Sequence, residues 1–405
     1  MGYFKDTLKG VSWMGGLRAT TRLFAFIKIA ILARILSPSQ FGLFGIALLI
    51  LSLLETLTET GINIFLIQEK EELEKYNDTA WFVSIIRGAL ISGLIFIFAK
   101  LIVIFFRSPD AYSLLLLISL VPLLRGFINP AIVKYQKELK FNKEFLLKAS
   151  IYTLDALVAI LLALITRSAS SLVWGMIAGV VFEIAISHLF IRPKPKLSLE
   201  KAKLNKVVSR GKWITLAGIF EYLFREGDDI VVGKLLNTTA LGIYQVAYKI
   251  STLPITEVAD TVIKVTLPVY VKISDEKARL RKAFTKTMLV VLAITLPIGL
   301  ILYIFSREVV LLLLGPNWIS AVSVLKILAG FGVIRALTIT THPLFLAVKK
   351  QNYLTATTLV GIFGLAITIF PLVSAYGIEG AGLSALIGSI LAIPLYIYYT
   401  LHILT

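Results

Sequence analysis

The feature that most constrains this chain is a series of apolar runs, each about twenty residues long, along its 405 residues. A helix of that length spans the hydrocarbon core of a bilayer, which is roughly 30 Å thick. Hydrophobic residues make up 57% of the chain and charged residues only 16%, against about 25% charged in soluble proteins. Because the runs are continuous rather than alternating, a β-barrel is excluded, and the sequence predicts an all-α integral membrane protein.

Twelve of these runs are expected to form membrane-spanning helices. The eighth contains Pro254 and Pro268, which predict a kink or a break because proline removes a helical hydrogen bond. A short apolar piece, 309–314, precedes Gly315 and Pro316, and we expect it to lie at the membrane interface. The expected helices are 11–36, 42–68, 79–105, 111–133, 145–166, 169–191, 211–235, 240–271, 285–305, 319–348, 352–374 and 379–402.

Lysine and arginine are distributed unequally between the two sets of loops. With the N-terminus in the cytoplasm, 24 of them lie in cytoplasmic segments, against three (Arg107, Arg167 and Arg307) outside. Cytoplasmic loops collect positive residues, so the sequence predicts a multi-pass protein of the cell membrane with both termini cytoplasmic. These loops account for most of the net charge of +17, and nucleic acid is not expected as a partner, since no soluble domain can present a basic groove.

The second half of the chain resembles the first at a fixed offset of 200 residues. The match has no gaps across the first hairpin, where 33–37 corresponds to 233–237. Later the register drifts, but Arg125 still has a counterpart in Arg335. Chance similarity of apolar helices is the alternative, and the shared Trp, Gly and basic positions favour duplication. The matches include Trp13 with Trp213, Leu23 with Leu223, Gly42 with Gly242 and Ala47 with Ala247.

The duplication predicts two lobes of six helices each. An even number of helices makes both copies enter the membrane from the same side, so they are parallel repeats related by an axis along the membrane normal. Two such lobes enclose a central cleft, an arrangement typical of transporters that use alternating access. The expected parts are an N-terminal lobe, 1–191, a basic cytoplasmic linker, 192–212, and a C-terminal lobe, 213–405.

Charged residues inside the first two expected helices need a reason, because a charge at bilayer depth costs about 2.5–3.5 kcal/mol. Arg18 and Arg22 share a face of the first helix, and Glu55 and Glu59 share a face of the second. Glu59 and Arg22 fall at a similar depth. Two interpretations are open: an ion pair between Arg22 and Glu59, and an anion site formed by Arg18 and Arg22 facing the cleft.

Helices seven and eight carry a similar set of charges. Lys249 lies near the depth of Asp228 and Asp229, so a salt bridge there is favoured over coupling to a cation. Singly placed charges are expected to pair or pack, except Arg125 and Arg335, whose equivalent positions in the two repeats favour substrate contact. The sets are Arg225, Asp228 and Asp229 on helix seven, Lys249, Glu257 and Asp260 on helix eight, and Arg87, Asp155, Glu183 and Lys326 among the single charges.

Catalytic signatures are absent from the sequence. No phosphate-binding loop of the type G-x-x-x-x-G-K-[ST] occurs. His188, His342 and His402 are scattered and have no carboxylates at metal-ligand spacing. No Ser/His/Asp set or carboxylate pair stands in a catalytic frame. We therefore expect no metal, no cofactor and no enzymatic activity.

Three segments carry a resemblance to a known family. The stretch 31–42 reads ILARILSPSQFG, 229–236 reads DIVVGKLL, and 314–318 reads LGPNW. Together they resemble polysaccharide flippases of the Wzx type, which belong to the multidrug/oligosaccharidyl-lipid/polysaccharide exporter superfamily. The resemblance covers most of the chain. Its motifs mark hairpin geometry and packing rather than chemistry.

The resemblance implies that a polyisoprenyl-diphosphate-linked oligosaccharide moves from the inner to the outer leaflet, for the synthesis of a surface polysaccharide. It also implies the flippases' two six-helix lobes around a central cavity that is often cationic, on a fold that the multidrug antiporters of the superfamily share. Guanidinium groups suit phosphate oxygens, so the candidate substrate ligands are arginines and one lysine. They are Arg18, Arg22, Arg125, Arg225, Lys249 and Arg335, and the candidate charge-balancing or ion-coupling residues are Glu55, Glu59, Asp228, Asp229, Glu257 and Asp260.

Further expected partners are membrane lipids, a coupling Na⁺ or H⁺ and other proteins of glycan assembly. Three alternative functions are considered. A cation-coupled drug antiporter on the same fold would have an acidic rather than a basic cleft. A membrane-embedded glycan polymerase or ligase would need a large outer loop with convergent polar residues, which the sequence lacks. A scaffold for glycan assembly without transport is disfavoured by the intramembrane charges.

Overall fold

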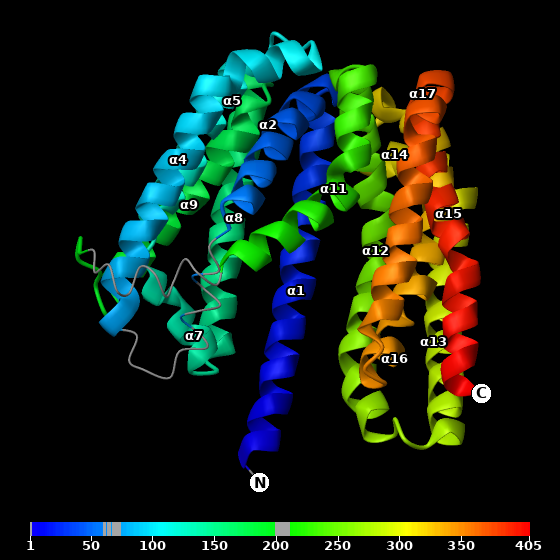
Figure 1. Cartoon of the computed structure of the whole chain (residues 1–405). Helices are drawn as coiled ribbons and strands as arrows, with labels where there is room; N and C mark the ends of the chain where they lie inside the picture. Colours follow the sequence, from blue (N-terminus) through cyan, green and yellow to red (C-terminus); the bar gives the residue numbers. More distant parts are fainter. Residues whose placement is uncertain (1, 60–61, 63–65, 67–73, 199–210) are drawn as a thin grey trace. The chain divides into compact units, whose positions relative to one another are not determined.

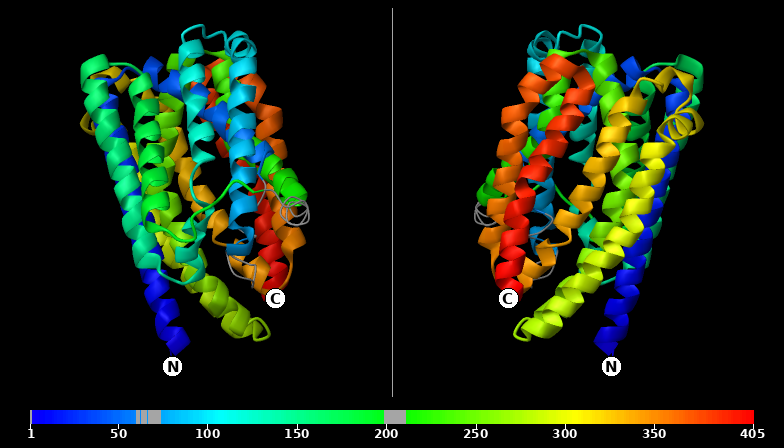
Figure 2. Two further views of the ribbon diagram at one scale, coloured as in Figure 1. Left: turned by 90° about the vertical axis from the view of Figure 1, so that its left-hand side faces the viewer. Right: turned by 90° about the vertical axis from the view of Figure 1, so that its right-hand side faces the viewer.

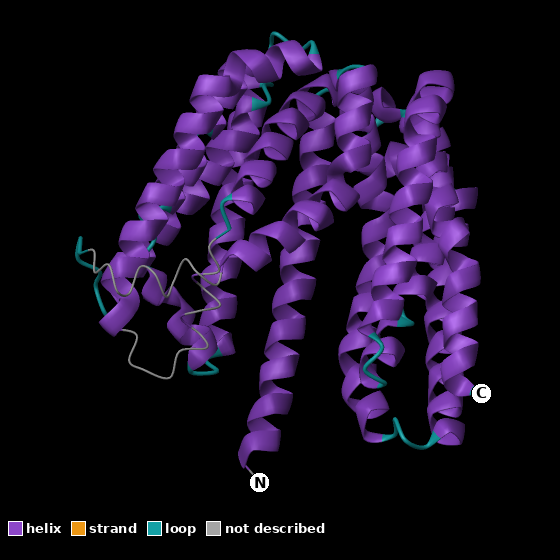
Figure 3. Ribbon diagram, in the orientation of Figure 1, coloured by secondary structure: helices purple, strands orange, loops and turns teal. Residues whose placement is uncertain are grey.

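The computed structural model describes residues 2–59, 62, 66, 74–198 and 211–405, and these residues form helices joined by loops, without a strand (Figure 3). The chain divides into two compact units, unit 1 (Met1–Gly227) and unit 2 (Asp228–Thr405). Figures 1 and 2 show the helices of both units, coloured along the sequence. The division falls within a helix, later than the expected linker 192–212, of which 199–210 lie outside the described residues. The lobe boundaries stay a prediction.

Unit 1 contains the helices of the first half of the chain. Helix α8 packs against α1 and α9, while α4 packs against α5 and α6, and α2 against α5. The helices are α1 (Gly2–Ile35), α2 (Pro38–Leu57), α4 (Glu74–Phe106), α5 (Ala111–Ile118), α6 (Leu120–Arg125), η1 (Pro130–Val133), α7 (Lys134–Lys137), α8 (Phe141–Thr166) and α9 (Ser170–Phe190), followed by the first part of α11 (Gly211–Leu235).

The expected fourth spanning helix, 111–133, is not one straight helix. It is divided into α5 and α6, and the chain then bends by 71° into η1 and α7. Glycines allow a close approach beside this bend: a Cβ on Gly88 of α4 would lie 2.3 Å from the carbonyl oxygen of Pro122 in α6. Asn129 caps the N-terminus of η1 after the bend, because its side chain accepts a hydrogen bond from the amide of Ala131. The break brings Arg125 to the end of a helix.

Unit 2 contains the remaining helices, of which α12, α13 and α17 all pack against α15. Gly377 has a φ of 59° and interrupts α17, so this long helix comprises the two spans expected at 352–374 and 379–402. The helices are the end of α11, α12 (Thr238–Lys272), α13 (Lys277–Ile304), α14 (Ser306–Leu313), η2 (Pro316–Trp318), α15 (Ala321–Ile339), α16 (His342–Ala347) and α17 (Gln351–Leu404).

The prolines of the eighth helix do not break it. Helix α12 is continuous through Pro254 and Pro268, so the break offered as one outcome does not form. Membrane helices tolerate proline when neighbouring groups satisfy the freed backbone. Most of the short piece at 309–314, by contrast, belongs to a separate helix, α14, which ends at Leu313. Gly315 follows with a φ of 95°, which suits a residue without Cβ.

Within the described residues, seven helices are long and apolar enough to cross a membrane, or eight if the bent pair α5–α6 and η1–α7 counts as one span. One of the seven is α17, which holds two expected spans. The protein is therefore a multi-pass membrane protein, and the number of twelve spans stays a prediction.

The first hairpin of each repeat folds in the same way. Ser37 accepts a hydrogen bond from the amide of Gln40 at the start of α2, and Asn237 accepts one from Ala240 at the start of α12. The same positions are buried in both hairpins, which supports the duplication inferred from the sequence. They are Leu32, Ala33, Phe41, Leu43, Ile46 and Ala47 in unit 1, and Val232, Gly233, Leu241, Ile243, Val246 and Ala247 in unit 2.

Candidate functional site

Unit 1 holds charges between its helices as ion pairs. Arg125 at the end of α6 lies 2.5 Å from Glu55 of α2 (Nη1 to Oε1), and the two side chains are 41% and 31% exposed. The sequence placed Arg125 and Glu55 in separate sets, with no indication that they would meet. The pair forms because the fourth span breaks directly after Arg125.

Arg87 of α4 binds the C-terminal end of α2. Its guanidinium donates to the hydroxyl of Thr58 (3.2 Å), the backbone carbonyl of Glu55 (2.7 Å) and the carboxylate of Glu59 (3.2 Å). The last carbonyls of a helix carry partial negative charge, which a cation stabilises. The expectation that Arg87 pairs is therefore confirmed.

Asp155 of α8 pairs with Lys28 of α1, and Lys28 Nζ lies 2.8 Å from both carboxylate oxygens. Both side chains are largely covered. Gly175 of α9 leaves the room, because a Cβ there would come within 2.6 Å of an Asp155 oxygen. The expected pairing of Asp155 is confirmed, although the sequence did not identify Lys28 as its partner.

The structure leaves the proposed Arg22 site untested. Arg22 is exposed on α1, and the side chain of Arg18 lies outside the described part of the structure. Glu59 binds Arg87, and both its pairing with Arg22 and the anion site on α1 stay predictions. Arg225 on α11 is 61% exposed and lies 3.7 Å from Glu226.

Two adjacent carboxylates of unit 2, Asp228 and Asp229, accept hydrogen bonds from neutral donors. Asp228 is 5% exposed and accepts hydrogen bonds from the hydroxyl of Tyr244 (2.6 Å) and the amide of Asp229 (3.0 Å). Asp229 accepts one from the side-chain amide of Gln245 (3.0 Å). These partners join α11 to α12 across the Asn237 hairpin. Each pair is 16 residues apart with the turn between its members, and this spacing was the sequence signal by which Tyr244 and Gln245 could have been found.

Arg335 of α15 contacts aromatic residues. Its guanidinium donates to the hydroxyl of Tyr248 (3.2 Å) and lies 5.6 Å from the ring centre of Phe331. The rings of Tyr248 and Phe331 lie 5.9 Å apart, and Tyr244 continues the set at 6.1 Å from Tyr248. Arg335 and Tyr248 are half-buried, whereas the rings of Tyr244 and Phe331 are buried. A guanidinium held against Tyr248 in this way has the chemistry of a site for an anion.

The other candidates are distributed along α12. Lys249 is exposed, and Glu257 and Asp260 are half-buried. A salt bridge of Lys249 with Asp228 or Asp229 stays a prediction. Within the described residues, no group of three or more His, Asp or Glu side chains is placed to hold a metal ion.

Comparison with known proteins identifies the family. Residues 31–323 match the family described as polysaccharide biosynthesis protein. The chain belongs to this family. Among its relatives, the lipopolysaccharide biosynthesis protein WzxC of Escherichia coli K12 is 26% identical over 338 residues, which cover 83% of this chain and 69% of WzxC. The succinoglycan biosynthesis transport protein ExoT of Rhizobium meliloti is 24% identical, over 80% of this chain and 66% of ExoT. The resemblance to Wzx-type proteins is confirmed.

Solved structures of transporters share the fold. The lipid II flippase MurJ, in an inward closed conformation, matches 95% of this chain and 86% of its own, with a TM-score of 0.76 at 15% identity. An inward-facing multidrug resistance transporter of the MATE family in the MOP superfamily matches 95% of this chain and 94% of its own, with a TM-score of 0.68 at 15% identity. The family member described here therefore has the all-α transporter fold expected from its sequence.

Proposed function

We propose that this protein is a flippase that moves a polyisoprenyl-diphosphate-linked oligosaccharide from the cytoplasmic to the outer leaflet of the cell membrane by alternating access. The observation that carries the proposal is the family match over residues 31–323, on a fold shared with a lipid II flippase. The relatives are named for lipopolysaccharide biosynthesis and succinoglycan transport, which supports a glycan precursor as substrate and transport rather than catalysis. The likeness to a drug transporter concerns the fold alone and does not favour drug export.

The chemistry of such a substrate suits Arg335 in unit 2. A diphosphate cannot enter hydrocarbon unaided, whereas a guanidinium group binds phosphate oxygens. We assign the main anion contact to Arg335 with Tyr248 beside it. Arg125 takes a structural role in this proposal, because it is bound to Glu55. We propose four further anion contacts on the basis of their positive charge, namely Arg18, Arg22, Arg225 and Lys249.

Coupling to Na⁺ or H⁺ is assigned to the half-buried carboxylates of α12, Glu257 and Asp260. Other glycan-assembly proteins are proposed partners that supply and consume the lipid. The proposed orientation has both termini in the cytoplasm. The chain has no cysteine, so single cysteines report orientation directly. Thr239→Cys should react with an impermeant maleimide in intact cells and Ser198→Cys should not, and the reverse pattern would overturn the direction of transport.

The function is tested with the purified full chain in liposomes that contain a fluorescent polyprenyl-diphosphate oligosaccharide. Flipping exposes the label to a membrane-impermeant quencher, so the quenched fraction should rise with the protein and stay near half without it. A matched lipid with the same sugar on a neutral glyceride anchor should not be moved. Equal movement of both lipids, or export of drug cations without movement of either, would contradict the proposal.

A further inference from the structure

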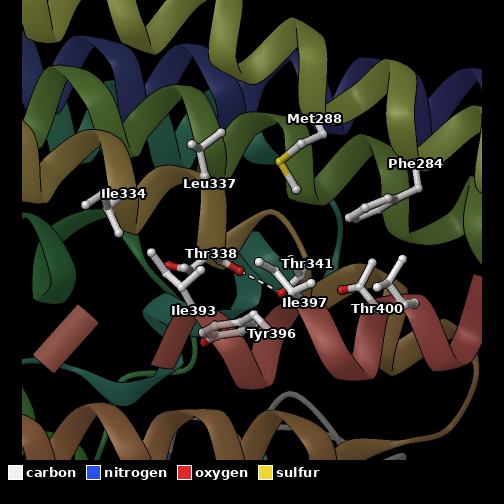
Figure 4. Close-up of a pocket in the computed structure, with 11 residues that line it drawn as sticks. Phe284, Met288, Ile334, Leu337, Thr338, Thr341, Ile393, Tyr396, Ile397 and Thr400 are labelled. Atoms are coloured by element: carbon white, nitrogen blue, oxygen red, sulfur yellow. Dashed lines mark hydrogen bonds between the residues drawn. The ribbon is translucent and has the colours of Figure 1, made fainter. Parts of the chain in front are cut away.

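Unit 2 contains an open apolar groove between α13, α15 and α17, with a volume of about 270 Å³ (Figure 4). Met288 of α13, Leu337 of α15 and Ile397 of α17 line its middle. Figure 4 places Ile334 at one end of the groove and Phe284 with Thr400 at the other. The groove is elongated along the helices, as a single hydrocarbon chain would require.

The groove leads towards two exposed cations on α13. One face of α13, about 60° wide at 100° per residue, carries Lys277, Arg281, Phe284 and Met288. Phe284 and Met288 line the groove, and the same face continues towards the N-terminus of α13 with Lys277 and Arg281. Both basic side chains are exposed. This end of α13 is cytoplasmic in the proposed orientation.

A buried hydroxyl lies between the apolar and the basic part. Thr400 Oγ1 is covered and has no hydrogen-bond partner among the described residues. It belongs to the groove wall at the Phe284 end, the end nearer Arg281 along α13 (Figure 4). Buried hydroxyls are normally hydrogen-bonded, so this one is suited to a ligand that offers an acceptor.

We propose that this groove binds one anionic glycerophospholipid of the cytoplasmic leaflet. One acyl chain lies in the groove, the phosphate contacts Lys277 and Arg281, and an ester carbonyl accepts a hydrogen bond from Thr400 after a rotation of that side chain. The order of cations, hydroxyl and apolar wall matches the order of phosphate, ester and chain in such a lipid. A polyisoprenyl diphosphate has no ester carbonyl, so the hydrogen bond to Thr400 distinguishes this lipid from the transported one.

The test measures lipid binding to the full chain in detergent by native mass spectrometry, with phosphatidylglycerol and phosphatidylcholine of identical acyl chains as probes. Wild-type protein should retain phosphatidylglycerol preferentially. The double variant Lys277→Gln/Arg281→Gln should bind it about tenfold more weakly. The control Arg279→Gln/Lys282→Gln removes the same charge from the opposite face of α13 and should bind as wild type.

Two further variants examine the groove itself. Ile397→Trp fills it from a half-exposed position and should lower phosphatidylglycerol binding without lowering the melting temperature. Thr400→Val should lower binding of the diester lipid to the level of its diether analogue, which has no carbonyl. Equal losses in both charge variants, equal binding of both lipids, or displacement of phosphatidylglycerol by undecaprenyl diphosphate would overturn the proposal. Because no transport is measured, these outcomes are independent of the flippase assignment.

Discussion

Arg125 in unit 1 and Arg335 in unit 2 are predicted from the sequence to be counterparts, and the structure gives them different partners. In unit 1, Arg125 meets the carboxylate of Glu55. In unit 2, the position 200 residues after Glu55 is Ile255, which is fully buried, and a Cβ on Gly332 of α15 would lie 3.1 Å from its side chain. Arg335 instead donates to the phenol of Tyr248.

The two arginines therefore make different kinds of contact, an ion pair in unit 1 and contacts with aromatic side chains in unit 2. An ion pair joins two helices and offsets both charges, so it suits a part of the protein that holds its shape. In unit 2, a hydrogen bond to a phenol and the face of an aromatic ring position the guanidinium of Arg335. The acids also differ: Asp155 is bound by the ammonium group of Lys28 in unit 1, whereas Asp228 accepts a hydrogen bond from the phenol of Tyr244 in unit 2.

The largest effect on stability is expected for Arg125→Gln, which leaves Glu55 without its cation. Removing one partner of a fully buried pair costs roughly 3–5 kcal/mol, and the partial exposure of this pair reduces the expected loss to about 2 kcal/mol. Arg335→Gln should cost less, about 1 kcal/mol, because the acceptor that loses the guanidinium is the neutral hydroxyl of Tyr248 and glutamine can still donate a hydrogen bond. Thermal unfolding of the purified variants measures both. The double variant Arg125→Gln/Glu55→Gln should recover most of the loss, and equal destabilisation by both arginine variants would remove the contrast.

The second prediction concerns transport. Arg335→Gln should fold and insert but reduce flipping by about tenfold or more, the effect of losing one charge-assisted phosphate contact. Arg335→Lys keeps the charge but not the planar donor geometry, and should fall between wild type and Arg335→Gln. The liposome assay provides the measurement. Normal flipping by a stable Arg335→Gln protein would assign the anion contact to another residue.

The third prediction concerns the buried acid of unit 2. Tyr244→Phe removes the hydroxyl that donates to Asp228 and should destabilise the protein by about 1 kcal/mol, the net contribution of one hydrogen bond. Tyr244→Phe combined with Asp228→Asn should recover part of this loss. If instead the single variant melts like wild type, the hydrogen bond between Tyr244 and Asp228 contributes nothing to stability.

The smallest effect sharpens the similarity of the units. Ser37→Ala and Asn237→Ala each remove a helix cap at the equivalent hairpin position, and each should cost about 1 kcal/mol. Ser37→Gly and Asn237→Gly should each lower the free energy of unfolding by only a few tenths of a kcal/mol, because glycine tolerates the cap position. Urea unfolding can compare all four variants. Clearly unequal costs at the two sites would show that the hairpins have diverged in energy as well as in sequence.

Much of the fold could be predicted because it depends on local patterns. Apolar runs of spanning length are a property of consecutive residues, and so are the prolines and glycines at their ends. The boundaries of α12 and α17 therefore lie close to expectation, and Gly377 divides α17 where two spans were expected. The interruption of the fourth span was missed, although Gly126 and Pro130 were signals for it, because the span was judged by its apolar length.

The sequence by itself determined the membrane class, the helical architecture, the repeated hairpins and the family resemblance, because each rests on composition or on fixed spacing along the chain. Only the tertiary structure decided the partners of the charges. Glu55 and Arg125 are 70 residues apart, and Lys28 and Asp155 are 127 residues apart, so no local period connects them. Such pairs depend on how helices rotate and approach one another. A glycine allows the approach by leaving room for an atom of a neighbouring helix, not by changing its own helix.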